Sequence, residues 1–206
     1  LINLEPKLRE LAAEGLVDIG RKRGSVLAYK EVLLSREAGI NIRMKAKDGL
    51  DDIGSEEAVA ALKEVLIYPG KKYAIRKMAL DGLVQIGSAQ AVRALKEVLI
   101  NLEPKLRELA AEGLVDIGRK RGSVLAYKEV LLSREAGINI RMKAKDGLDD
   151  IGSEEAVSAL KEVSTNPEIE PGIRGLAADG VVELGSEDIT RSITQGMQDL
   201  QQAPGM

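Results

Sequence analysis

The sequence predicts an all-α protein, an α-solenoid of six two-helix repeats of about 33 residues each. Residues 1–65 and 99–163 are identical except that Ala60 is replaced by Ser158. A shorter motif recurs within this block, as LRELAAEGLVDIG (8–20), IRMKAKDGLDDIG (42–54) and IRKMALDGLVQIG (75–87). The apolar residues of each motif have the spacing of a helix face. Duplication of a helical unit is the signature of a solenoid.

The motif occurs six times, at spacings of 34, 33, 31, 34 and 33 residues. A three-repeat block, 1–98, is therefore followed by a second one, 99–206. One helix pair cannot bury its apolar face alone, whereas stacked pairs can. We expect residues 1–206 to form a single continuous solenoid. The last repeat, about 167–206, is more polar and is expected to be a diverged C-terminal cap.

The first helix of each repeat carries one apolar stripe. In repeat 1 it consists of Leu8, Leu11, Ala12, Gly15, Leu16 and Ile19. A Gly inside each first helix costs about 0.5–1 kcal/mol relative to Ala, so Gly15 and its counterparts indicate close approach of a neighbouring helix. We expect each first helix to end at a left-handed Gly, namely Gly20, Gly54, Gly87, Gly118, Gly152 and Gly185.

The second helix begins after a Ser in four repeats. These residues, predicted to be N-caps, are Ser55, Ser88, Ser153 and Ser186. In the helix that follows Ser55, the residues predicted to face the core are Val59, Leu62, Val65 and Leu66. Repeats 1 and 4 carry a longer segment, GRKRGS, which we expect to be an extended turn.

Composition disfavours several classes of function. The 206 residues include 30 basic and 33 acidic side chains, a net charge of −3, which argues against a dedicated nucleic-acid or membrane surface. There is no His and no Cys, so the common nucleophile–base pairs and metal sites have no residues to form them. We expect no catalytic, cofactor or metal site. No apolar stretch or leader is apparent, which predicts a cytoplasmic protein.

The pattern xIRxxAxxGLxxIGSxxAVxALxEVL resembles short HEAT repeats of the phycobilin-lyase type, and designed proteins derived from them. The resemblance covers almost the whole chain. It implies an Arg near the start of each first helix that pairs, between repeats, with an acid near its end. The arginines are Arg9, Arg43, Arg76, Arg107, Arg141 and Arg174, and the implied acids are Asp18, Asp52, Asp116, Asp150 and Glu183, with Gln85 departing from the pattern.

The resemblance also places the second helices on the concave side, where partners bind in such arrays. The candidate protein-binding residues are Leu27, Lys30, Glu31, Ala60, Lys63, Arg93, Lys96, Leu125, Lys128, Ser158 and Lys161. Constant Lys–Glu pairs on successive helices predict a charge ladder that stabilises the stack. Leu27 and Leu125 are expected to be exposed, which makes them the better contact candidates.

Nucleic-acid binding through GRKRGS is the alternative. The candidate phosphate contacts are Arg21, Lys22, Arg23, Arg119, Lys120 and Arg121. The acidic net charge weighs against it, as does the absence of Phe and Trp for base stacking.

The sequence thus favours a non-enzymatic scaffold that binds a protein or peptide, with no ligand defined. It begins within a repeat, so Leu1, Ile2 and Leu4 are expected to be exposed and to promote self-association through an uncapped N-terminal face. The block duplication arose either in a genome or by engineering. Because three unlike units alternate, a natural block copied once is favoured.

Overall fold

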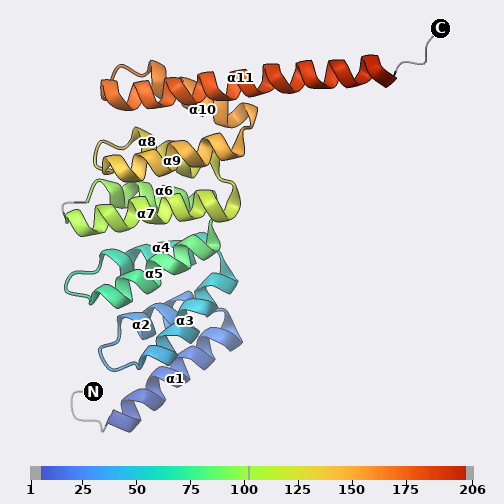
Figure 1. The fold of residues 1–206 in the computed structure, drawn as a ribbon. Coiled ribbons are helices and arrows are strands. Elements are labelled where there is room, and N and C mark those ends of the chain that lie inside the picture. Colours follow the sequence, from blue (N-terminus) through green and yellow to red (C-terminus); the bar gives the residue numbers. More distant parts are fainter. Residues whose placement is uncertain (1–5, 102, 203–206) are drawn as a thin grey trace.

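A computed structural model describes residues 6–101 and 103–202, and for Pro6 and residues 187–202 it describes the backbone alone. This part of the chain contains eleven helices and no strand. The helix pairs are stacked one upon another from α1 to α11, which confirms the predicted all-α solenoid (Figure 1). The helices are α1 (Pro6–Arg23), α2 (Val26–Leu34), α3 (Ile40–Ile53), α4 (Glu56–Ile67), α5 (Tyr73–Ile86), α6 (Ala89–Leu99), α7 (Pro104–Arg121), α8 (Val124–Leu132), α9 (Ile138–Ile151), α10 (Glu154–Thr165) and α11 (Pro171–Gln202).

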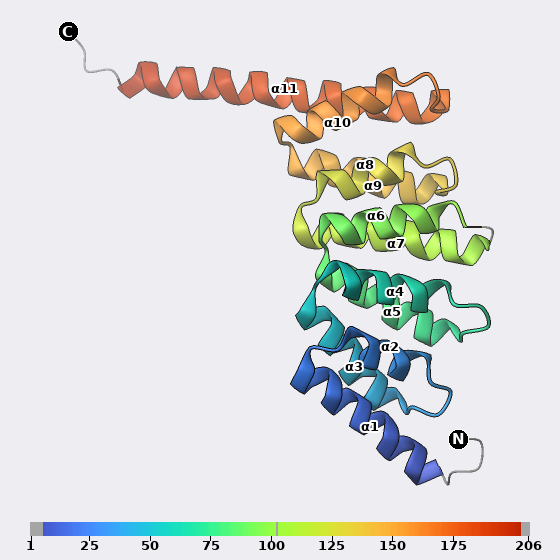
Figure 2. The same cartoon turned by 180° about the vertical axis from the view of Figure 1, so that it is seen from behind.

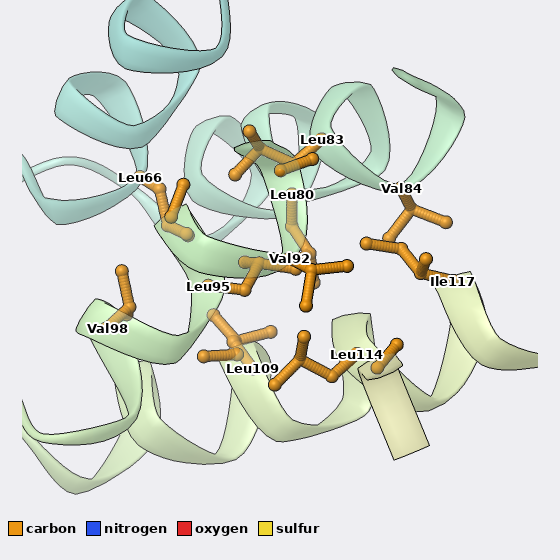
Figure 3. Close-up of a cluster of buried hydrophobic side chains, with 14 of the residues drawn as sticks. Leu66, Leu80, Leu83, Val84, Val92, Leu95, Val98, Leu109, Leu114 and Ile117 are labelled. Atoms are coloured by element: carbon orange, nitrogen blue, oxygen red, sulfur yellow. The ribbon is translucent and has the colours of Figure 1, made fainter. Parts of the chain in front are cut away.

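The core is a continuous apolar seam between the helix pairs. The inward set predicted for α4 is buried, with Leu62 and Leu66 fully inaccessible to solvent. Across the boundary between the duplicated blocks, side chains of α5 and α6 pack on α7, as Leu95 and Leu109 show in Figure 3. Burying one such side chain stabilises the fold by about 1.5–3 kcal/mol. The core therefore continues through the block boundary.

The predicted turn between first and second helices is present in three repeats. Gly54, Gly87 and Gly152 each have a φ of 57°, in the left-handed region. At the first of these, the N–H of Gly54 donates to the carbonyl of Leu50 over 3.0 Å. The hydroxyl of Ser55 then accepts a hydrogen bond from the N–H of Ala58. The Gly-Ser pair therefore ends one helix and caps the next, as the sequence predicts.

The prediction that Gly20 and Gly118 end their helices is wrong. Helix α1 continues to Arg23, and the left-handed residue is Gly24, with a φ of 62°. Gly20 lies under a tyrosine ring, since a Cβ atom there would come within 2.5 Å of Tyr29 Cε1. Basic residues in the last turn of a helix interact favourably with its dipole, so GRKR extends the helix rather than forming a turn. α7 repeats this arrangement, with Gly118 against Tyr127 and Gly122 at the helix end.

The prediction of a turn at Gly185 is also wrong. Helix α11 runs unbroken from Pro171 to Gln202, and its second half extends beyond the stack (Figure 2). Ser186 Oγ donates to the carbonyl of Glu183 over 2.7 Å instead of capping a new helix. Helix propagation adds one hydrogen bond per residue. The residues after Gly185 are more polar than those of the earlier second helices, so folding back would bury little apolar surface in exchange.

The arginines of the first helices do bridge repeats, but the acids implied for them are wrong. Arg76 Nη1 donates to Glu103 Oε1 over 2.5 Å, and Glu103 immediately precedes the next first helix. An acid such as Asp18 lies nine residues, or about 14 Å, along the helix from Arg9, which is too far for an ion pair between parallel helices. The observed pairs are Arg9–Glu37, Arg76–Glu103, Arg107–Glu135 and Arg141–Glu170.

The acidic residues that the resemblance implied as partners of these arginines form other ion pairs or are exposed. Asp18 and Asp116 pair with arginines of their own helices. Glu183 pairs with Lys145 across the interface between α9 and α11. Asp52 and Asp150 are exposed. The resemblance therefore predicts correctly that the arginines bridge repeats, but the acids that it implies are not their partners.

The continuous helix at Gly185 can be tested against the turn at Gly152. Gly185→Ala should raise the free energy of unfolding by about 0.5–1 kcal/mol, because Ala favours a helix and no atom lies within 4 Å of its Cβ. Gly152→Ala should lower it by about 1–2 kcal/mol, because the left-handed conformation disfavours a side chain. Urea unfolding followed by circular dichroism measures both. Equal losses in the two variants would show that α11 is broken at Gly185.

Candidate functional site

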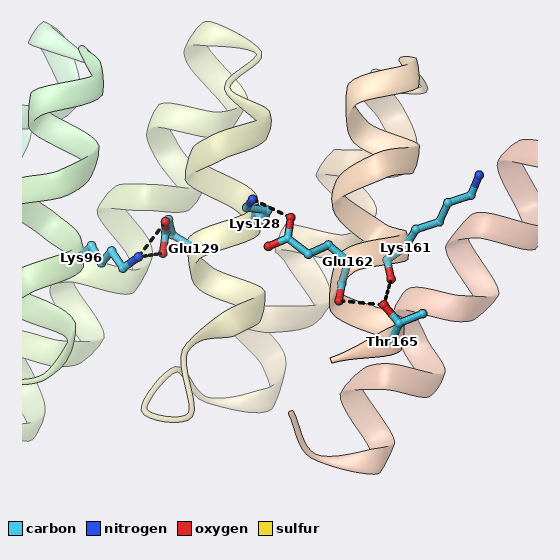
Figure 4. Close-up of polar contacts among 6 residues, drawn as sticks. All are labelled: Lys96, Lys128, Glu129, Lys161, Glu162 and Thr165. Atoms are coloured by element: carbon cyan, nitrogen blue, oxygen red, sulfur yellow. Dashed lines mark hydrogen bonds and ion pairs between the residues drawn. The ribbon is translucent and has the colours of Figure 1, made fainter. Parts of the chain in front are cut away.

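The predicted Lys–Glu ladder is present along the second helices. Each Lys extends to a Glu of the next second helix, with Nζ–Oε distances of 2.6–2.9 Å. Figure 4 shows the rungs that join α6 to α8 and α8 to α10. The rungs are Lys30–Glu64, Lys63–Glu97, Lys96–Glu129 and Lys128–Glu162. These lysines are therefore engaged within the stack, whereas Glu31 and Lys161 are exposed on the same helices.

The five variable positions next to the ladder all face solvent. They are Leu27, Ala60, Arg93, Leu125 and Ser158. Of these, Leu27 is the most prominent apolar residue, with 61% of its surface exposed. The structure thus places the candidate contact residues on an accessible surface.

A shallow groove of about 430 Å³ lies between α2 and α4. Its apolar lining includes Val26, Leu27 and Ala60. Glu57 and the Lys30–Glu64 ion pair form its polar part. The groove can therefore accept an apolar side chain beside acidic groups, and it unites three of the predicted residues.

The second copy differs from the first at this position. Leu125 is 37% exposed, less than Leu27. Val124 is buried where Val26 is only partly so, because α8 packs on α6 while no described second helix precedes α2. Ser158 also replaces Ala60, which makes the surface more polar. The first copy is the more apolar candidate surface.

The basic GRKR segments are partly neutralised by their own chain. Arg21 lies 3.6 Å from Asp18. Arg119 pairs with Asp116 one turn earlier in α7. Arg121 donates to the backbone carbonyl of Gln85 in the preceding repeat. The remaining candidates, Lys22, Arg23 and Lys120, are exposed.

A second pocket, of about 510 Å³, was not anticipated from the sequence. It lies at the ends of α3 and α5, beside Arg121. Acidic and basic groups line it together, including Asp51 and Lys47. Lys47 Nζ lies 2.8 Å from Asp51 Oδ2, one helical turn away. The spacing of this pair is visible in the sequence, but its burial depends on the next repeat.

The carboxyl group of Asp51 has the most strongly shifted pKa among the residues that line this pocket. Its Oδ1 atom is buried without a hydrogen-bond partner and lies against α5, where a Cβ at Gly82 would be 2.9 Å away. Burial raises the pKa of Asp51 to about 6, although its hydrogen bond to Lys47 acts in the opposite direction. Burial likewise raises the pKa of Asp149, the same residue of the second block. There Lys145 pairs with Asp149 and with Glu183 of α11, whereas Lys47 pairs with Asp51 and Asp48 of its own helix.

Asp51 should make stability depend on pH in a defined direction. Since its pKa is higher in the folded state, its contribution is fully present below about pH 4 and is lost as the pH rises through about 6. The free energy of unfolding of the wild type, relative to Asp51→Asn, should therefore fall across this interval. Urea unfolding of both proteins at several pH values measures the difference. A difference that is constant or rises with pH would contradict the buried state of Asp51.

Two further findings concern the described residues. None of their helices combines the length and apolarity needed to cross a membrane. No three of their acidic side chains are grouped so as to hold a metal ion.

No protein-family model and no curated protein matches the sequence. Among solved structures, human deoxyhypusine hydroxylase in complex with glycerol is 15% identical, covering 90% of this chain and 81% of its own, with a TM-score of 0.42. An engineered protein is 18% identical over 89% and 93% of the two chains, with a TM-score of 0.34. The complex of CpcE and CpcF of phycocyanin lyase from Nostoc is 19% identical over 88% of each chain, with a TM-score of 0.34. Phycocyanin lyase subunits and an engineered protein are thus among the solved structures to which this chain is similar.

Proposed function

We propose that this chain is a binding scaffold that catalyses no reaction and that takes up a protein or peptide on its second helices. The observation that supports this most is the groove between α2 and α4, in which Leu27 is largely exposed. Interaction sites of proteins are commonly marked by exposed apolar residues within a polar rim. The groove has this composition.

The groove also indicates the chemistry of its partner. Glu64 is already paired with Lys30, while Glu57 adds a further carboxylate. The three charges sum to −1, so a basic residue is favoured next to the apolar anchor. We therefore propose a segment with one apolar side chain that contacts Leu27 and a neighbouring Lys or Arg near Glu57.

The amino-acid composition of the chain is consistent with the proposed function as a binding scaffold. The sequence lacks His and Cys, which supply most nucleophile–base pairs. The lysines beside the groove stabilise the stack through the ladder instead of standing free. Nucleic acid is not favoured, because acids of the same helices offset Arg21 and Arg119.

Substitution of Leu27 tests this proposal. Peptides selected from a random display library on the full chain should bind Leu27→Glu roughly tenfold more weakly, since the variant introduces a charge where the apolar anchor contacts the groove. Fluorescence polarisation with the selected peptides measures the change.

Met44→Glu is the matched control, because Met44 is about half exposed on α3 and does not line the groove. It should bind the same peptides as the wild type does. Selected peptides that bind Leu27→Glu unchanged would contradict the proposed binding surface.

A further inference from the structure

The pocket of about 510 Å³ at the ends of α3 and α5 has no part in the function proposed above. Three successive first helices line it, because Arg121 of α7 adds to the wall that α3 and α5 form (Figure 1). Described helices pack on both sides of these three, α1 on one side and α9 on the other. The volume is in the range of sites for small molecules. Every wall of this pocket is therefore built from residues in the middle of the stack.

The duplication shows the lysine of this pocket a second time, with an additional partner. Lys47 of α3 corresponds to Lys145 of α9, and each pairs with the aspartate one helical turn later. Lys145 Nζ also lies 2.7 Å from Oε2 of Glu183, which belongs to α11 of the next repeat. At the position of Glu183, the motif of α5 carries Gln85. A carboxylate is therefore bound at this lysine in the second block, and the first block has no acid at the position that supplies it.

The carboxylate in the second block stabilises a partly buried charge. Burial acts to lower the pKa of Lys145, but its hydrogen bonds to Asp149 and Glu183 outweigh this effect and raise the pKa. The side chain of Lys145 is 13% exposed, so water and salt screen these ion pairs weakly. Lys47 is similarly covered, with 19% of its side chain exposed. A carboxylate that reaches Lys47 meets the same kind of ammonium group.

Lys47 keeps a hydrogen-bond donor for such a group. An ammonium group has three donors, and the carboxylates of Asp48 and Asp51 accept from two of them. The side chain of Asp48 is 63% exposed, so its ion pair with Lys47 contributes little and exchanges readily with water. The lysine can therefore accept a further carboxylate without losing its buried partner, Asp51.

Arg121 adds a second cationic donor to the same pocket. Its Nη2 donates to the backbone carbonyl of Gln85, at the end of α5. A guanidinium group has five N–H donors, and Arg121 is exposed, so the others are accessible to an incoming group. Hydrogen bonds between arginine and a carboxylate are among the strong ones, because both groups are charged.

The acidic residues of the pocket do not exclude a carboxylate. Two basic and three acidic side chains line it, which gives a net charge of −1. The same three aspartate positions surround Lys145, and Glu183 is bound there nevertheless. In addition, burial raises the pKa of Asp51 to about 6, so its negative charge is partly lost in mildly acidic solution.

We propose that this pocket binds a carboxylate group, held by Lys47 and Arg121 in the way that Lys145 holds Glu183. The group belongs to a free carboxylic acid or to an acidic side chain of a peptide, which present the same chemistry. This inference is independent of the groove between α2 and α4, because none of the residues that line the pocket lines the groove.

Two probes distinguish these sources, namely glutarate and a capped tripeptide, acetyl-Gly-Glu-Gly-amide. Each is titrated into the isotope-labelled full chain, and amide chemical shifts are followed by NMR. Both probes should shift the amides of Lys47, Gln85 and Ser88 saturably. The amides of Lys145 and Glu183 should not move, because a carboxylate already fills the corresponding place. Tighter binding of glutarate would identify a free acid as the ligand, and tighter binding of the tripeptide an acidic segment.

Substitutions then test the two donors. Gln85→Glu should raise Kd for both probes by roughly tenfold or more, because the new side chain supplies Lys47 with a carboxylate as Glu183 supplies Lys145. Arg121→Gln should raise Kd by roughly threefold or more, because it removes the second cationic donor. Ala89→Glu is the matched control. It adds the same charge at the exposed first residue of α6, which does not line the pocket, and should change Kd by less than about twofold.

Three results would overturn the proposal. The first is the absence of saturable shifts with both carboxylate probes. The second is an equal rise of Kd in Gln85→Glu and Ala89→Glu, which would show that only the overall charge matters. The third is saturable binding of diaminobutane at the amides of Lys47 and Gln85 without binding of glutarate, which would show that the pocket takes a cation.

Discussion

The structure depends on one constraint, that no helix pair of this chain can bury its apolar face without a neighbour. Gly113 shows how the neighbour is accommodated, because the missing side chain leaves room for Leu80 and Leu95 from the preceding repeat. Fully buried leucines recur at each such interface, and together they form one core from α1 to α11. The charge ladder lies outside this core, whereas the bridging residues Arg76 and Arg141 are themselves buried. Exposed ion pairs contribute about 0–1 kcal/mol each, so the ladder aligns the repeats while burial stabilises them.

Because the sequence is duplicated, identical residues can be compared at two places in the stack, which shows how position alone changes their exposure. The stripe that begins at Leu8 and continues through Leu11 is exposed, although the same residues in α7 are buried. Glycine behaves in the same way, since Gly15 faces open space and Gly113 is in close contact. The position of a residue in the stack therefore decides whether it is buried, and identical residues can be core in one repeat and exposed in another.

Much of this architecture follows from periodicity. The spacing of Leu62 and Leu66 predicts their burial, and constant Lys–Glu pairs predict the ladder, because both depend only on the repeat. The ends of helices were harder to predict. A Gly-Ser pair marks a turn at Gly54 but not at Gly185, where the residues that follow are too polar to form an apolar face for the stack. The buried carboxylate of Asp51 was missed for a related reason, because α5 of the next repeat covers it. Leu27 was placed correctly on the surface, whereas the volume of its groove depends on how α2 and α4 meet.

Hydrogen exchange of the two identical segments tests the central claim most directly. Residues 7–59 and 105–157 have the same sequence, so their intrinsic exchange rates are equal and any difference reports tertiary position. If packing between repeats stabilises the fold, amides of α7 should be protected much more strongly than the matching amides of α1, while α3 and α9 should differ less. Equal protection of α1 and α7 would show that each block folds by itself, and would contradict the account.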